Sequence, residues 1–153
     1  MPYPIKCNRC GHSSTAWEIV DFIANHTAPD GRLRCDSCSA NDAHIYRHSK
    51  TQDGGTWERY IRAVIPFRTQ FGRKFVPYVF LLSYSARGRP VDVHFNYYKD
   101  ERPKGRLKHG HGPGGAPVFG KHQIVKLIEN VIRYKVITRN DLEQAINGCG
   151  IAD

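Results

Sequence analysis

This sequence of 153 residues lacks any apolar run near the roughly 20 residues needed to cross a bilayer, and its longest run, residues 76–84, has strand length. It also lacks the apolar segment of a secretory signal near its start. Its composition shows none of the bias of a disordered chain, because apolar residues make up 40% and aromatics 11%. These absences predict a folded cytoplasmic protein with no membrane partner.

Acidic residues are scarce in the middle of the chain. Residues 56–120 hold twelve Lys or Arg and only four Asp or Glu, whereas residues 1–48 hold five of each. Nearly all of the formal net charge of +9 therefore lies in one segment. Concentrated positive charge attracts a phosphate backbone through counterion release, so nucleic acid is the expected partner. A basic surface without a nucleic-acid ligand is the alternative.

Cysteine is also scarce, with five in the chain, but four of them form two pairs: Cys7 with Cys10 and Cys35 with Cys38. Two residues between paired cysteines allow a tight turn to present both thiolates to one ion, and Gly11 supplies permissive backbone after the first pair. Four thiolates suit one structural Zn²⁺. An iron–sulfur centre and disulfides are the less favoured alternatives for this spacing and the expected reducing compartment.

The segments CNRCGH and GRLRCDSCSANDAHIYR resemble the zinc-ribbon class over residues 5–48. The resemblance implies a metal-stabilised module with a strand after the second pair, and Ser39 stands where glycine is common. It does not imply one activity, since zinc ribbons serve in nucleic-acid machinery, in protein docking and as folding supports. With four cysteines available, the nearby histidines are expected to be surface groups or neighbours of the ligands: His12, His26, His44 and His48.

The segment between the two pairs, residues 13–31, predicts a helix. Ser14 is its expected cap, with Trp17, Val20, Ile23 and Ala24 on one face. We therefore expect a zinc-ribbon module over residues 1–48, with the polar residues 49–55 as a linker to a basic domain over residues 56–153.

Three strand-like runs follow, over residues 56–67, 74–85 and 90–98. The third alternates strictly, so its apolar side chains are expected inward and its polar ones outward. The inward set is Val91, Val93, Phe95 and Tyr97, and the outward set is Asp92, His94, Asn96 and Tyr98.

Two helices are predicted at the end of the chain. Residues 121–136 carry a broad apolar stripe, and Thr138 with Asp141 forms a capping box for the second helix. The predicted fold class is therefore α+β: an N-terminal four-cysteine zinc ribbon with an inserted helix, then an antiparallel β-meander packed by two C-terminal helices.

A basic Gly/Pro-rich loop over residues 101–120 precedes these helices, and loops of this length are usually functional or disordered. Cations suit phosphates and tyrosines suit unpaired bases. The candidate nucleic-acid contacts are Arg87, Arg89, Tyr97, Tyr98, Lys99, Arg102, Lys104, Arg106 and Lys108.

The function that these patterns favour is zinc-binding, non-enzymatic nucleic-acid binding. The first alternative is a protein-docking subunit of a nucleoprotein or regulatory complex, because the cysteine-bearing segment has no net charge. The second is a metal-dependent nuclease using His94, His109 and His111, although no HExxH or paired-carboxylate pattern supports it. The sequence leaves open whether the strand is DNA or RNA, single or double.

Overall fold

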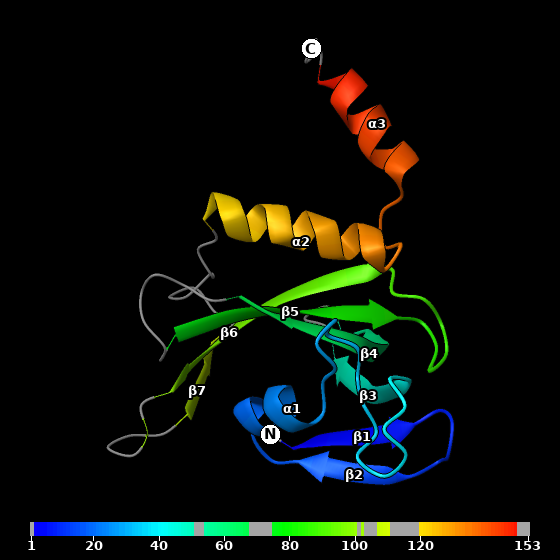
Figure 1. Ribbon diagram of the computed structural model, residues 1–153, viewed down its shortest axis with the longest axis vertical. Helices are drawn as coiled ribbons and strands as arrows, with labels where there is room; N and C mark the ends of the chain where they lie inside the picture. Colours follow the sequence, from blue (N-terminus) through cyan, green and yellow to red (C-terminus); the bar gives the residue numbers. More distant parts are fainter. Residues whose placement is uncertain are drawn as a thin grey trace.

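The computed structural model describes residues 2–50, 54–67, 75–100, 102, 107–110 and 120–149. Within these ranges, seven strands form one sheet accompanied by three helices, which confirms the predicted α+β class (Figure 1). The strands lie in the order β2-β1-β3-β4-β5-β6-β7, and every neighbouring pair is antiparallel. The elements are β1 (Tyr3–Cys7), β2 (Ser13–Ala16), α1 (Ile19–Asn25), β3 (Ala43–Lys50), β4 (Thr56–Pro66), β5 (Phe75–Ser83), β6 (Asp92–Asp100), β7 (Leu107–Gly110), α2 (Lys121–Arg133) and α3 (Arg139–Gly148).

The predicted meander is the part of the sheet from β4 to β7. The strands of the N-terminal part, β1 to β3, join the same sheet, since β3 pairs with both β1 and β4. Residues 49 and 50, placed in a linker by the sequence, are the end of β3. One hydrophobic core also includes residues from both sides of the predicted boundary, such as Phe22 and Phe80. The division of the chain into two modules stays a prediction.

The helix between the cysteine pairs is shorter than the sequence indicates. Ser14, its expected cap, lies in β2, because the segment up to Ala16 pairs with β1. The helix begins at Ile19, after Trp17, and buries Ile19 and Phe22. Val20 and Ile23 of the predicted face are only partly buried against the same core. The ring of Phe22 stacks on Tyr3 with a centroid separation of 5.0 Å, and Trp17 is 72% exposed. Strand pairing thus replaces the first turn of the predicted helix.

The expected inward and outward faces of β6 are corrected by the structure. Asn96 is only 5% exposed and Tyr98 packs against the core that contains α1, whereas Phe95 is 44% exposed. The sheet carries cores on both faces, so alternation along β6 could not tell which face was buried. On the other face Val93 does pack inward, beneath α2.

A second hydrophobic core lies on the other face of the sheet and is covered by Val131 of α2 and by Tyr134, the residue after this helix. Both pack with Ile65, Val79 and other residues of β4 and β5. Helix α3 buries no residue and projects away from the sheet in Figure 1. The prediction that both helices pack on the sheet is therefore right for α2 only. The capping box at the start of α3 is confirmed.

A β-bulge interrupts β4. Ile61 pairs with Leu82 and Ala63 with Leu81, so Arg62 is the extra residue. Bulges redirect a side chain away from the regular alternation of a strand.

The loop after α1 is attached to β4 just beyond this bulge. Arg32 forms a bridge with Ala63, and the amide of Val64 donates to the carbonyl of Gly31 at 2.8 Å. Gly31 has φ +89°, and a Cβ there would lie 2.7 Å from the carbonyl oxygen of Val64. Glycine is required here, and it holds Arg32 beside the strand that carries Arg62.

Candidate metal centre and adjoining basic pocket

The four paired cysteines come together in space. Their Sγ atoms all lie within 4.8 Å of one another, with 3.7 Å between Cys7 and Cys38 and 3.8 Å between Cys10 and Cys35. A tetrahedron with metal–sulfur bonds of about 2.3 Å has edges of about 3.8 Å, so these separations fit one ion. All four are free thiols, which leaves no disulfide in the cluster. The predicted metal-ligand set is thus positioned to hold a metal ion.

Local backbone geometry aims the sulfurs at one point. The amides of Arg9 and Cys10 both donate to Sγ of Cys7, at 3.4 and 3.5 Å. Gly11 turns the chain back with φ +76°. In the second turn the amide of Cys38 donates to Sγ of Cys35 at 3.5 Å, and Ser39, which stands where glycine is common, adopts the left-handed φ of +56°.

These amide contacts favour thiolates. Burial opposes ionisation of Cys7, but the N–H groups of Cys10 and Arg9 outweigh it and lower the pKa of Cys7 to about 7. At Cys10 a hydrogen bond from the amide of His12 favours the thiolate. Hydrogen bonds with the neighbouring cysteine thiols, together with burial, outweigh it, so the pKa of Cys10 is raised. A cation is what would allow all four sulfurs to ionise together.

No histidine joins the cluster among the residues described. Nε2 of His12 lies 3.3 Å from Oδ1 of Asp36, and both side chains are substantially exposed. The four cysteines are the one group of three or more potential ligands in the described ranges. Of the four histidines expected at the surface or beside the ligands, His12 and His48 are exposed and His44 contacts Asn8 in the first cysteine turn, whereas His26 is buried, at 8% exposed.

Asn8, inside the first cysteine turn, connects that turn to the sheet. Its Nδ2 donates to Oδ1 of Asp42 at 2.8 Å and to the carbonyl of Ala86 at 2.9 Å. Its Oδ1 accepts from Nδ1 of His44 at 2.8 Å, and its carbonyl accepts from Arg87 at 3.0 Å. The cysteine turn is thereby fixed to β3 and to the β5–β6 turn, although nothing in the sequence pattern singled out Asn8.

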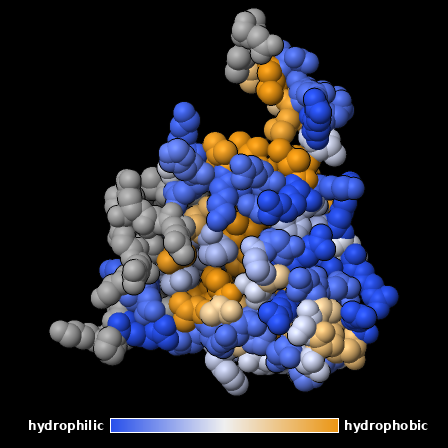
Figure 2. All heavy atoms as spheres, in the orientation of Figure 1, coloured by the Kyte–Doolittle hydropathy of each residue, from blue (hydrophilic) through white to orange (hydrophobic). Residues whose placement is uncertain are grey.

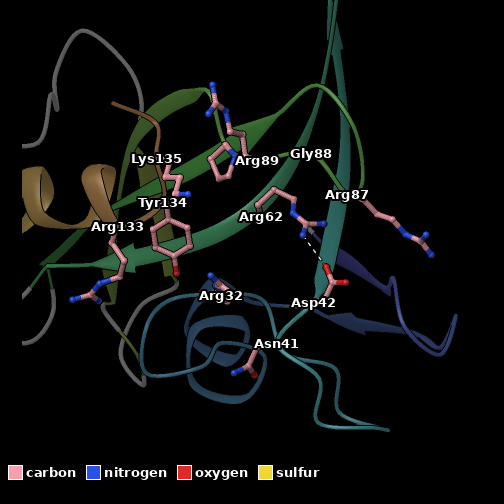
Figure 3. Close-up of a pocket in the computed structure, with 11 residues that line it drawn as sticks. Arg32, Asn41, Asp42, Arg62, Arg87, Gly88, Arg89, Arg133, Tyr134 and Lys135 are labelled. Atoms are coloured by element: carbon pink, nitrogen blue, oxygen red, sulfur yellow. Dashed lines mark hydrogen bonds and ion pairs between the residues drawn. The ribbon is translucent and has the colours of Figure 1, made fainter. Parts of the chain in front are cut away.

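A cavity of about 480 Å³ opens beside this connection (Figure 3). We call it the basic pocket, because six of its eleven lining residues are Arg or Lys and only one is acidic. The lining residues are Arg32, Asn41, Asp42, Arg62, Arg87, Gly88, Arg89, Pro90, Arg133, Tyr134 and Lys135. The face drawn in Figure 2 is mostly hydrophilic over β1 and β2, and apolar atoms gather along α2 on its side toward α3.

The charges around the basic pocket are only partly balanced. Nη2 of Arg62 donates to Oδ1 of Asp42 at 2.8 Å, and Nε of Arg32 lies 3.5 Å from the Asp30 carboxylate. Burial opposes the ionised form of Asp42, but hydrogen bonds from Asn8 and Arg62 lower its pKa. The pKa of His44 is lowered by burial and then by the positive charge of Arg62. Positive charge contributes to both shifts, from Arg62 and Arg87 at Asp42 and from Arg62 and Lys6 at His44.

The candidate nucleic-acid contacts fall into separate places. Arg87 and Arg89 lie on the turn between β5 and β6 and line the basic pocket. Tyr97, Tyr98 and Lys99 lie on β6, where Lys99 pairs with Lys108 of β7. These two groups of contacts are at different parts of the sheet.

Four of the candidates need separate mention. Tyr98 is partly buried against the core, which leaves less of its ring for stacking. Arg102 forms ion pairs with Asp100 and Glu18. Lys104 and Arg106 lie outside the described residues.

The histidines of the nuclease alternative are not brought together by the sheet register. His94 pairs with Phe80, whereas His109 pairs with Tyr98, four residues further along β6. That places the two backbones about 14 Å apart along the strand. His111 lies outside the described residues.

Comparison with protein-family models, with curated proteins and with solved structures finds no match for this chain. None of the helices in the described ranges has the length and apolarity to cross a bilayer.

Proposed function

We propose that this chain is a zinc-binding, non-enzymatic protein that binds nucleic acid through its phosphate backbone. Zinc is the favoured ion because four thiolates in a closed tetrahedral arrangement are typical of structural zinc sites. Four thiolates would fill all four tetrahedral positions of the ion and leave none open for a substrate. The ion's role is then to fold the cysteine turns.

The observation that carries the nucleic-acid proposal is the attachment of the first cysteine turn to the turn that bears Arg87 and Arg89. Nδ2 of Asn8 donates to the carbonyl of Ala86, the residue before Arg87, and Nη2 of Arg87 donates to the carbonyl of Asn8. Metal binding would therefore fix the position of cations at the surface. Fixed cations lose little conformational entropy when they contact phosphates.

The loop over residues 101–120 supplies the second group of cations in this proposal. Arg102 is paired with two carboxylates, so it would contribute less to the salt dependence than Lys104, Arg106 or Lys108. Each cation that contacts a phosphate adds about one unit to the slope of log affinity against log salt.

Fluorescence anisotropy across a salt series tests the proposal, with labelled single- and double-stranded DNA and RNA and zinc-loaded protein. The alanine variant of Arg102, Lys104, Arg106 and Lys108 should bind more weakly, with a slope smaller by about three units. Arg139→Gln on α3, whose side chain is 90% exposed, is the matched control. Binding by the quadruple variant equal to that of the parent would refute the loop assignment, and no binding even at about 50 mM salt would refute the function.

Docking to a protein partner is the second candidate function, favoured by Trp17. This side chain is 72% exposed on the cysteine-bearing part of the chain, which carries no net charge. Large exposed aromatics are enriched at the centres of protein interfaces. A purified chain that binds no nucleic acid at low salt but forms a stoichiometric complex sensitive to Trp17→Ala would favour docking.

A further inference from the structure

The basic pocket gathers cations that are far apart in the sequence. Arg32 follows α1, Arg62 belongs to β4, Arg89 to the β5–β6 turn and Lys135 to the segment after α2. Six cationic side chains and one carboxylate line the pocket, for a formal charge of +5. Asp30, near Arg32, and Asp141, whose pKa Arg89 helps to lower, reduce this excess without cancelling it.

Arg62 is the most enclosed of these cations, since only 15% of its side chain is exposed. The bulge in β4 places it here, and one Nη2–H donates to Asp42. Nη1 is buried, with no acceptor among the described residues. A guanidinium carries five N–H donors, and a buried donor without a partner is costly. An anion in the pocket would supply the missing acceptor once the guanidinium rotates toward it.

The other cations are arranged around Arg62. In the view of Figure 3, Arg62 lies between Arg89 and Arg32, and Lys135 lies beside Tyr134. The guanidinium groups of Arg87, Arg89 and Arg133 point away from the centre and belong to the rim (Figure 3). Arg32 also lies over the ring of Tyr134, at 5.8 Å from its centroid. These contacts hold the walls in place before a ligand enters.

We propose that the basic pocket binds a phosphomonoester dianion, the group found at the end of a nucleic-acid strand and on a mononucleotide. A phosphomonoester has close to two negative charges at neutral pH and three strong acceptor oxygens. A terminal phosphomonoester can enter a concave site end-on. A phosphodiester within a strand carries only one charge, and the chain on both sides of it would have to pass out of the pocket. The volume of about 480 Å³ lies within the range of about 300–1,000 Å³ typical of small-ligand pockets. The inference does not depend on the proposed function, because a mononucleotide has the same group.

The experiment compares one oligonucleotide sequence with a 5′-phosphate, a 3′-phosphate or hydroxyl groups at both ends, and compares adenosine 5′-monophosphate with adenosine. Zinc-loaded full-length chain is used throughout. A terminal phosphate should tighten binding about tenfold, as expected for charge-assisted hydrogen bonds in a half-open site. Arg62→Lys, which keeps the charge but loses the planar fork, and Lys135→Gln should each reduce this ratio severalfold. Arg139→Gln should leave it unchanged, and thermal unfolding shows whether Arg62→Lys is folded.

The outcomes separate the inference from the proposed function. Preference for a phosphorylated end that falls in Lys135→Gln supports the pocket with a strand end as its source. Binding of adenosine monophosphate but not adenosine, without any preference among strands, supports it with a mononucleotide. Equal binding of all three strands without nucleotide binding overturns the inference and leaves nucleic-acid binding standing. Nucleotide binding by a chain that binds no strand refutes the proposed function alone, and no binding of either kind refutes both.

Discussion

Asn8→Ala tests whether the cysteine turn is held to the sheet by the side chain of Asn8. The substitution removes three hydrogen bonds, to Asp42, to the carbonyl of Ala86 and from His44, all between 2.8 and 2.9 Å long. Each such bond contributes about 0.5–1.5 kcal/mol net, so the expected loss in free energy of unfolding is about 2–4 kcal/mol. Asp42 keeps its contact with Arg62, which argues against a larger loss.

Urea unfolding of zinc-saturated protein measures this loss, with the zinc concentration held constant because metal binding stabilises the folded state. With a urea m value of about 2 kcal/mol/M, the midpoint should fall by about 1–2 M while m stays unchanged. The matched control is Asn25→Ala on α1. Nδ2 of Asn25 donates only to Asp21 at the surface, so its removal should change stability by less than about 0.5 kcal/mol.

A midpoint for Asn8→Ala within experimental error of the parent would show that the three contacts contribute nothing, and that the cysteine turn is held by the metal and backbone alone. An equal loss in Asn25→Ala would point to a general effect of removing asparagine. The first result would remove the side-chain part of the link between metal binding and the Arg87 turn, and would leave only the hydrogen bond from Arg87 to the Asn8 carbonyl.

Three further predictions concern the metal, the core and pH. Native mass spectrometry should find about one zinc per chain, and Cys35→Ser should lose it together with the near-ultraviolet circular dichroism of the folded protein. Phe22→Ala should cost about 3–5 kcal/mol in urea unfolding because Phe22 is fully buried, whereas Trp17→Ala, at a 72% exposed site, should cost less than about 0.5 kcal/mol. In the folded protein, hydrogen bonds from Thr138 lower the pKa of Asp141 below 3.8. The ionised carboxylate therefore stabilises the start of α3 above pH 3.8, and this contribution to stability is lost as the pH falls through the lowered pKa. Thr138→Ala keeps the backbone N–H and removes the hydroxyl donor, so in a carbon NMR titration it should raise the pKa of Asp141 part of the way toward 3.8, and an unchanged value would contradict a role for the hydroxyl.

The metal-ligand set could be predicted from the sequence because its information is local. Two residues between cysteines fix the size of each turn, and the requirements at Gly11 and Ser39 follow from the same local geometry. The capping box of α3 is local in the same sense, since Thr138 and Asp141 are three residues apart. Features of this kind depend little on what the rest of the chain does.

The errors arose where long-range pairing competes with local preference. Ser14 is a good helix cap in isolation, but its segment pairs with β1 and becomes a strand. On β6, alternation alone predicts one buried face, whereas residues far away in sequence cover both faces of the sheet. Asn96 is buried and Tyr98 packs against the core around α1, and no pattern within β6 reports the presence of that helix.

The basic pocket could not be predicted from charge alone, because its cations come from segments whose proximity only the fold creates. The bulge in β4 is equally hidden in the sequence, because Ile61, Ala63 and Ile65 fit the regular alternation of a strand. The structure shows the bulge in the packing, since Ile61 and Val64 both belong to the core around α1 although a regular strand puts positions three apart on opposite faces. Enclosing the side chain of Arg62 costs free energy that a solvated cation does not, and the fold brings this cost and the other cations of the pocket to one place.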